Sequence, residues 1–318
     1  MVDAGGLKER LQEVRTAVHT AVVGREAIVD QVLLGLLSDG HLLLEDLPGL
    51  GKTLIARSFA GALGLDFQRI QFTADLLPHD LTGGEVMDPQ KGGFTFRPGP
   101  LFTQLLLADE INRAPPKVQS ALLEAMQEYQ ITSERESRPL ARPFLVLATE
   151  NPLELEGTYP LPEAQVDRFL LRLRVGYPTP EEERAILARR RARRQDTWEV
   201  PPVLGPGEFR RLQGAVEEVE LDASVEGYIV DLVRATRQDP RAEVGASPRG
   251  SLALQKVARA RALLEGRSFV LPDDVKLLAA PALAHRIVVK AEPWIRGIRS
   301  EAIVDQCLAQ TPVPKVRA

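Results

Sequence analysis

Leu42-Leu43-Leu44-Glu45-Asp46-Leu47-Pro48-Gly49-Leu50-Gly51-Lys52-Thr53 joins an apolar run to a glycine-rich turn that ends in Gly-Lys-Thr. The glycines let successive backbone N–H groups turn inward, and the lysine and hydroxyl that follow can reach phosphate oxygens and a Mg²⁺ ion. A helix that starts near Lys52 adds its unpaired N–H groups and the positive end of its dipole. The stretch therefore predicts a buried strand, a phosphate-binding loop and a helix, in that order.

One position departs from the usual form of such a loop, which begins with glycine. Here that position is Asp46, so the loop keeps three of its four fixed elements. Because a carboxylate directed at phosphates would repel them, we expect the Asp46 side chain to turn away, toward solvent or a nearby arginine. Taken by itself, the loop leaves open an ordinary Gly/Pro turn before a helix.

The composition is that of a soluble globular protein: 318 residues, 44% hydrophobic and 26% charged, with a net charge of −4. This balance gives no general basic field for nucleic acid. The one cysteine, Cys307, cannot form an internal disulfide, which favours a reducing compartment. The start of the chain lacks the regions of a signal peptide, and no apolar run is long enough to cross a bilayer. We therefore expect a cytoplasmic protein without membrane insertion.

Short apolar stretches alternate with helical periods through the first part of the chain. This alternation predicts an α/β fold in which a parallel sheet is covered by helices. Two helices with apolar residues at helical spacing precede the first strand. The expected strands are residues 41–45, 67–72, 105–110, 144–149 and 169–175, and the expected helices between them are 52–63 and 116–129.

A proline-rich segment, Tyr177-Pro178-Thr179-Pro180, marks a change in this pattern. Only helical periods follow it, so we expect an α/β domain over residues 1–177 and an all-α domain over residues 178–318. The expected helices of the second domain are 181–194, 208–219, 223–237, 248–264, 273–284 and 301–308.

Two further segments interrupt the α/β part, at about residues 82–98 and 129–143. Each has the pattern of two short strands around a turn, glycine-rich in the first segment and charged in the second. We predict two inserted hairpins. Surface loops of no special role are an equally favoured alternative.

The strand at 105–110 ends in two adjacent acids, Asp109 and Glu110. Carboxylates at the carboxyl end of a strand lie where open α/β sheets bind ligands. Asp109 is the candidate for holding Mg²⁺, and Glu110, which points the other way, can polarise an attacking water. A solvated turn would explain the pair by itself, but the Gly-Lys-Thr loop upstream favours the catalytic interpretation.

Asn151 and two arginines complete the candidate set. Asn151 follows the strand at 144–149, and its neutral amide can donate and accept at once and so orient a water, although turn chemistry can also place Asn-Pro there. Arg168, and Arg249 behind a Ser-Pro helix start, carry the planar charged fork that grips phosphate oxygens. A surface salt bridge is the alternative for each arginine. The arginine-rich run at 189–194 is interpreted as an exposed helix face, with nucleic-acid contact less favoured.

Together and in this order, these motifs resemble those of AAA+ ATPases, and within them the MoxR group. The resemblance covers nearly the whole chain, and it identifies the two hairpins as the helix-2 insert and the pre-sensor-1 insert of that clade. The motifs are Val23-Gly24-Arg25-Glu26, residues 44–53 as Walker A, 108–114 as Walker B, 148–152 as sensor 1, 161–169 with Arg168 as the arginine finger, and 245–249 with Arg249 as sensor 2.

The resemblance implies an ATPase core with a helical lid and a ring, usually of six subunits, with ATP at each interface. Arg249 would act on the γ-phosphate in its own subunit, and Arg168 would enter the neighbour's site. MoxR members are chaperone-like remodellers that often work with proteins bearing a von Willebrand factor A domain. The residues implied in nucleotide binding are Gly24, Pro48, Gly49, Leu50, Gly51, Lys52, Thr53 and Leu54, and those implied in Mg²⁺ binding are Thr53 and Asp109.

We therefore expect a homo-oligomeric, Mg²⁺-dependent ATPase that remodels or activates a protein client, with Glu110, Asn151, Arg168 and Arg249 as its catalytic residues. A nucleotide-gated scaffold with incidental turnover is the first alternative, and Asp46 is the feature that favours it. A nucleic-acid motor is the second. A small-molecule kinase is less favoured still, because Asn151 and Arg249 beside a helical second domain would have no role there.

Overall fold

A five-stranded parallel sheet is the centre of the α/β region in the computed structural model, which describes residues 4–88, 93–133, 136–152, 157–195 and 198–315. The strand order is β2-β5-β8-β1-β9, and all four pairings are parallel. The predicted parallel sheet is confirmed. Its strands are β1 (Leu42–Glu45), β2 (Phe67–Gln71), β5 (Leu105–Asp109), β8 (Leu145–Glu150) and β9 (Leu171–Leu173).

Alternate residues of each strand point to opposite faces of the sheet, and each face has its own hydrophobic cluster. Leu42 and Leu44 belong to one cluster with helices α1, α2 and α3, whereas Leu43 belongs to the other with α4 and α5. The sheet is therefore covered on both sides, as a parallel sheet must be. These helices are α1 (Ala4–Ala21), α2 (Glu26–Leu37), α3 (Lys52–Leu63), α4 (Pro78–Thr82) and α5 (Pro116–Glu128).

The register of the sheet brings the carboxyl ends of four strands to one edge. Glu45 at the end of β1 pairs with Glu150 at the end of β8, and Gln71 at the end of β2 pairs with Asp109 at the end of β5. Open parallel sheets bind ligands outside these ends. The glycine-rich loop after β1, the two acids after β5 and Asn151 after β8 therefore meet at this edge.

Among the described residues after the proline-rich segment, the named elements are helices and a short antiparallel pair of strands, β10 and β11, that the sequence did not predict. Strands of three and two residues are too short to leave a period in the sequence. The helices of this part are α7 (Pro180–Arg193), α8 (Pro206–Glu217), α9 (Ala223–Gln238), α10 (Pro248–Leu264), α11 (Pro272–Leu283), α12 (Ala291–Ile295) and α13 (Ser300–Gln310). The two strands are β10 (Ala242–Val244) and β11 (Val288–Val289). Three further short helices are α6 (Glu163–Val166), η1 (Ile111–Arg113) and η2 (Ala284–Arg286).

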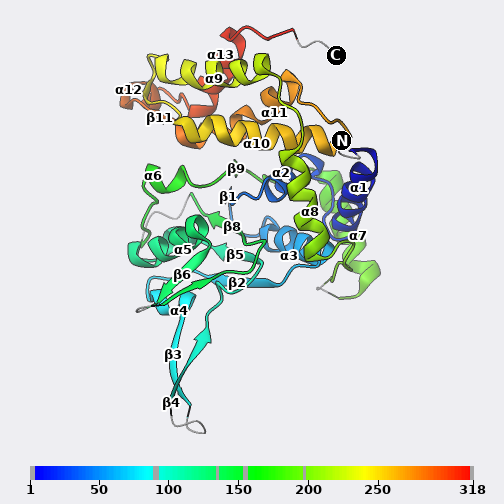
Figure 1. The fold of residues 1–318 in the computed structure, drawn as a ribbon, viewed down its shortest axis with the longest axis vertical. Coiled ribbons are helices and arrows are strands. Elements are labelled where there is room, and N and C mark those ends of the chain that lie inside the picture. Colours follow the sequence, from blue (N-terminus) through cyan, green and yellow to red (C-terminus); the bar gives the residue numbers. More distant parts are fainter. Residues whose placement is uncertain (1–3, 89–92, 134–135, 153–156, 196–197, 316–318) are drawn as a thin grey trace.

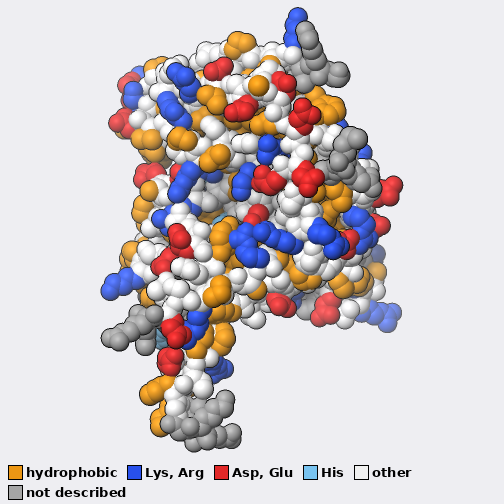
Figure 2. Space-filling model, viewed as in Figure 1, with side chains coloured by type: hydrophobic (Ala, Val, Ile, Leu, Met, Phe, Trp, Pro, Cys, Tyr) orange, Lys and Arg blue, Asp and Glu red, His pale blue; other side chains and the backbone are white. Residues whose placement is uncertain are grey.

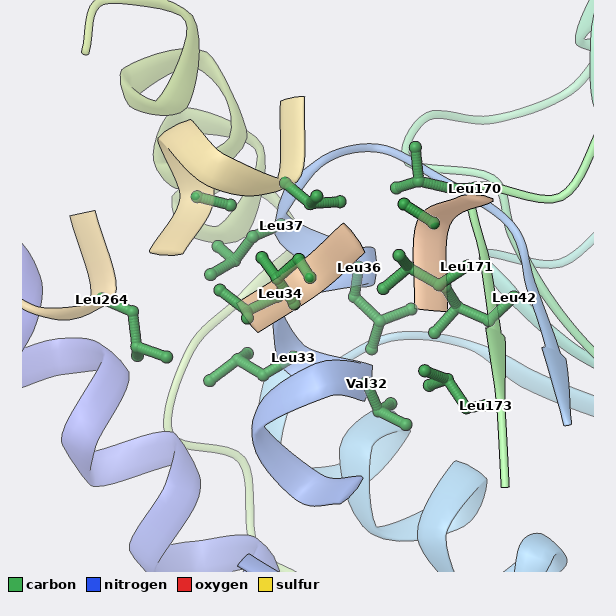
Figure 3. Packing of buried hydrophobic residues seen from close by; sticks show 14 of the residues in the cluster. Val32, Leu33, Leu34, Leu36, Leu37, Leu42, Leu170, Leu171, Leu173 and Leu264 are labelled. Atoms are coloured by element: carbon green, nitrogen blue, oxygen red, sulfur yellow. The ribbon is translucent and has the colours of Figure 1, made fainter. Parts of the chain in front are cut away.

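Helices α7 and α8 return to the α/β core before the remaining helices form a layer above it (Figure 1). The backbone N–H groups of Val203 and Leu204 both donate to the carbonyl of Ala62 in α3, and the Gln213 side chain donates to that of Leu36 in α2. One hydrophobic cluster contains residues of both parts, and Figure 3 shows Leu264 of α10 on one side of the α2 leucines and Leu171 and Leu173 of β9 on the other. The division into residues 1–177 and 178–318 stays a prediction.

Two antiparallel hairpins lie where the sequence predicts them. The first, β3 (Gly83–Asp88) with β4 (Gly93–Pro98), projects from the body, and the second, β6 (Gln130–Ser133) with β7 (Glu136–Pro139), precedes β8 (Figure 1). The turns at 89–92 and 134–135 lie outside the described residues. The first hairpin exposes Val86, Met87 and Phe94, and Figure 2 shows hydrophobic side chains along it.

In the ranges that the structure describes, no helix combines the length and apolar character needed to cross a bilayer.

A buried histidine joins β8 to the end of α5. His41 donates through Nε2 to the carbonyl of Met126 (2.9 Å) and accepts at Nδ1 from the backbone N–H of Val146 (3.1 Å), which requires the neutral ring. Burial lowers the pKa of His41 to about 4. Burial also lowers the pKa of His285 well below its usual value.

The lowered pKa values of His41 and His285 predict that the folded protein loses stability in acid. In the unfolded chain these histidines bind protons below about pH 6.5, whereas His41 in the folded protein binds a proton only near pH 4. The contribution of His41 to the free energy of unfolding is therefore complete above pH 6.5 and falls as the pH decreases. We expect His41→Gln, measured by urea unfolding at pH 7 and pH 4.5, to reduce this pH dependence by roughly 2 kcal/mol. His79→Gln, which changes an exposed histidine, is the matched control, and the reduction should be larger in His41→Gln because His41 is buried. An unaltered dependence in His41→Gln would contradict the assignment.

Candidate functional site

The glycine-rich loop has the backbone geometry that its sequence predicts. Gly49 (φ 82°) and Gly51 (φ 86°) are both left-handed, and α3 begins at the next residue, Lys52. A Cβ added to either glycine would meet no atom within 4 Å. These positions therefore require glycine for its conformation, and the space in front of the loop is open to a ligand.

Lys52 lies at the start of α3 with only 8% of its surface exposed. Its Nζ donates to the main-chain carbonyl of Asp46 at 2.6 Å. Burial lowers the pKa of this ammonium, and the carboxylates of Asp109, Asp46 and Glu110 act in the opposite direction. The ammonium, the loop and the helix N-terminus together favour an anionic ligand.

Asp46 has partners that the sequence did not predict. Its Oδ1 accepts from the backbone N–H of Leu47 (2.8 Å), and its Oδ2 accepts from that of Gly176 (2.5 Å), beyond the end of β9. Two backbone amides thus bind the carboxylate of the half-buried Asp46, in place of the arginine that the sequence suggested as one alternative. Asp46 is also not among the described residues that line the cavity beside the loop.

That cavity has a volume of about 220 Å³ and a mostly apolar wall. It suits the flat, largely apolar base of a nucleotide next to a phosphate-binding loop. The sequence analysis missed the part of the wall that Pro178, Ile186 and Arg193 contribute, because it interpreted residues 177–180 only as a domain boundary and α7 only as an exposed helix face. Its lining is Ala21, Val22, Val23, Arg25, Gly49, Leu50, Gly51, Leu54, Ile55, Pro178, Ile186 and Arg193.

Gly24 lies between two residues of this wall and contacts the N-terminus of α7. It is left-handed (φ 61°), and a Cβ there would lie 1.9 Å from Oε1 of Glu182. The same oxygen accepts from the backbone N–H of Arg25, while Oε2 accepts from that of Thr179. Gly24 thus permits the close approach of α7 to the cavity, and its predicted contact with nucleotide stays a prediction.

The two acids after β5 diverge because Glu110 is left-handed (φ 58°). Asp109 accepts from Arg69 (2.6 Å), and Glu110 accepts from Gln71 (2.7 Å) and Arg113 (3.0 Å). Arg69 and Gln71 come from the neighbouring strand β2, so only the sheet register reveals them. Each acid is held by cationic or amide donors in this structure.

Thr149 at the end of β8 connects the two acids, and the sequence did not single it out. Its hydroxyl donates to Oδ1 of Asp109 (2.6 Å) and accepts from the backbone N–H of Glu110 (2.8 Å). Asn151 follows two residues later at the same edge of the sheet, and its carbonyl accepts from the Asn112 side chain (3.4 Å). The role of the Asn151 amide stays a prediction.

The two singled-out arginines lie together at a different cavity, of about 410 Å³. Ser247 caps α10 and Pro248 is its first residue, as predicted, and Arg249 pairs with Asp167 (3.8 Å), the neighbour of Arg168. Arg286, which also pairs with Asp167, and Lys256 add positive charge to this cavity. Among the described residues that line the cavity beside the loop, neither Arg168 nor Arg249 occurs.

The arginine-rich face of α7 is partly occupied by contacts with the body of the protein. Arg189 donates to the carbonyl of His19 (2.6 Å), and the Arg193 guanidinium lies 5.5 Å from the ring centre of Trp198. These contacts favour a structural role for this face over nucleic-acid binding.

Comparisons with known proteins show which family the chain belongs to. A family described as "ATPase family associated with various cellular activities (AAA)" matches residues 41–171, and an "AAA lid domain" matches residues 234–307. Chaperone MoxR1 of Mycobacterium tuberculosis is 41% identical over 99% of this chain and 86% of its own length. The chain belongs to the MoxR family of AAA+ ATPases.

Two further matches to this MoxR-family chain extend over almost its full length. The protein YeaC of Bacillus subtilis is 47% identical over 95% of this chain and 94% of its own. The crystal structure of a putative ATPase from Cytophaga hutchinsonii superimposes with a TM-score of 0.92, at 40% identity, over 98% of this chain and 97% of its own. The AAA+ fold with an α/β core and a helical lid is therefore confirmed.

Proposed function

We propose that this MoxR-family protein hydrolyses ATP with Mg²⁺ at a site completed by a neighbouring subunit, and that it uses hydrolysis to remodel or activate a partner protein. The observation that carries this proposal is the separation of two half-sites. The phosphate loop and the acids lie at one place, whereas Arg168 and Arg249 line another cavity. Two copies side by side could join these halves.

The first half-site fits ATP in shape and charge. The open loop and Lys52 would hold the phosphates, and the apolar cavity would hold the base. Thr53 at the start of α3 and Asp109 are the residues that would bind Mg²⁺. When bound, Mg²⁺ neutralises the charge that develops on the phosphate oxygens. In this structure Asp109 accepts hydrogen bonds from Arg69, and Mg²⁺ would have to displace this guanidinium in order to bind Asp109.

Glu110 is the proposed base that accepts the proton of the attacking water, and Asn151 would orient this water. In this structure Gln71 and Arg113 both donate to Oε2 of Glu110. Two donors therefore occupy this oxygen, and a water that approaches it has to displace at least one of them.

Arg168 is the proposed residue that enters the site of the neighbouring subunit. An arginine supplied in trans can accelerate phosphoryl transfer by roughly 10³–10⁵. We propose that Arg249 enters the same neighbouring site, in place of the action within its own subunit that the resemblance implies. Its pairing with Asp167, next to Arg168, supports this change.

The proposed client is a protein, and a partner with a von Willebrand factor A domain fits the family. A relative named as a chaperone and the exposed Val86, Met87 and Phe94 on the projecting hairpin support a protein client. A ring of six subunits and a cytoplasmic location belong to the same proposal. The alternative of a nucleotide-gated scaffold predicts negligible steady-state phosphate release by the assembled protein.

Glu110→Gln should bind ATP as tightly as the wild type but lose at least about a hundredfold in the rate of phosphate release, because the amide cannot accept the proton. Equilibrium binding of a fluorescent ATP analogue and steady-state phosphate release measure the two effects. Glu226→Gln, which changes an exposed acid in the first turn of α9, is the matched control and should retain the wild-type rate. Undiminished release by Glu110→Gln would refute its assignment as the base.

Mixed rings test whether the arginines act between subunits. Arg168→Ala and Lys52→Ala should each be inactive, but their mixture should recover part of the activity, since some interfaces then join an intact loop to an intact Arg168. Arg249→Ala mixed with Lys52→Ala should recover activity for the same reason. The double variant Arg168→Ala/Lys52→Ala, mixed with Arg168→Ala, is the control and should recover none. Absence of recovery in rings shown by native mass spectrometry to be mixed would contradict action in trans.

A further inference from the structure

Asp46, the residue that departs from the usual phosphate loop, contacts three separate parts of the protein. Its backbone N–H donates to the carbonyl of Glu150 at the end of β8 (3.1 Å), and its carbonyl accepts from Lys52 (2.6 Å). Its side chain accepts from the backbone N–H of Gly176, which lies between β9 and α7. One residue thus joins the phosphate loop, the strand before Asn151 and the segment that leads to the helices.

Only the last of these contacts requires a side chain. Glycine at this position could make both main-chain hydrogen bonds but could not reach Gly176. The carboxylate also accepts from Leu47, which fixes its orientation. Hydrogen bonds to an ionised acceptor are roughly twice as strong as neutral ones. The departure from the standard loop therefore adds one specific, charge-assisted connection.

The segment that Asp46 holds, residues 175–180, belongs to the wall of the candidate nucleotide cavity. Pro178 lines this cavity, and the carbonyl of Val175 accepts from the Arg25 side chain (3.4 Å). Glu182, just beyond the segment, binds the backbone N–H groups of Arg25 and Thr179. We refer to residues 175–180 as the linker. Its two ends are thus tied to the loop and to the residues before α2.

We propose that Asp46 is a positioning residue that fastens the phosphate loop to the linker, so that occupancy of the loop sets the position of the linker. The inference rests on the proposed binding of ATP. In this structure Lys52 donates to the Asp46 carbonyl, and a phosphate would compete for the same ammonium. When Lys52 binds phosphate instead of the Asp46 carbonyl, Asp46 keeps its hydrogen bonds to Glu150 and Gly176. A displacement of Asp46 then moves the linker through the bond to Gly176.

Amide hydrogen exchange at Gly176 tests the connection, measured by mass spectrometry with fragmentation that resolves single residues. In the nucleotide-free protein, Asp46→Asn should accelerate exchange at Gly176 by about tenfold to a hundredfold, because the charged acceptor is lost. Glu45→Gln is the matched control. It removes the preceding carboxylate, which pairs with Arg172 and Arg174 instead, and should leave Gly176 unchanged.

The coupling is tested in Glu110→Gln, to which saturating ATP and Mg²⁺ are added. We expect ATP to change exchange in the linker by at least about threefold, and Asp46→Asn to abolish this change while the affinity for ATP stays within about fivefold. Asp46→Gly, which restores the usual loop residue, serves if Asp46→Asn does not fold. Failure of ATP to bind Glu110→Gln would refute the proposed function. ATP binding without a change in the linker, or with the same change in the Asp46 variants, would overturn the role of Asp46.

Discussion

The register of the parallel strands determines which side chains meet at the candidate nucleotide site. Because β1, β2, β5 and β8 end at one edge, the loop that follows β1 faces the acids that follow β5 and the asparagine that follows β8. The glycines can form a cradle only because α3 begins directly behind them and is packed into the core. The chemistry proposed for the protein therefore follows from sheet register and helix packing more than from any single side chain.

Polar contacts between neighbouring strands hold the candidate catalytic groups in place. Thr149 connects Asp109 to the backbone of Glu110, and the donors from β2 occupy both carboxylates. Asp46 extends this network to the linker. A ligand at the loop would compete for Lys52 and for the partners of the acids at the same time. In this account, binding and the rearrangement of the site are one event.

The motifs determined much of what could be predicted from the sequence. The strand–loop–helix unit, the acids at the end of β5 and the Ser-Pro start of α10 are local features, and each lies where the sequence predicts it. Thr149, Gln71 and the partners of Asp46 were missed because strands distant in sequence bring them together. The location of Arg249 depends on how α10 packs against α1, α2 and α8, which no local pattern encodes.

We propose that a complete ATP site requires two subunits, and the dependence of ATPase activity on assembly tests this requirement. Phosphate release per subunit should be measured across a dilution series in which mass photometry reports the fraction of assembled protein. We expect activity per subunit to rise in proportion to the assembled fraction and nearly to vanish in the monomer. Constant activity per subunit across the transition from monomer to assembly would contradict it.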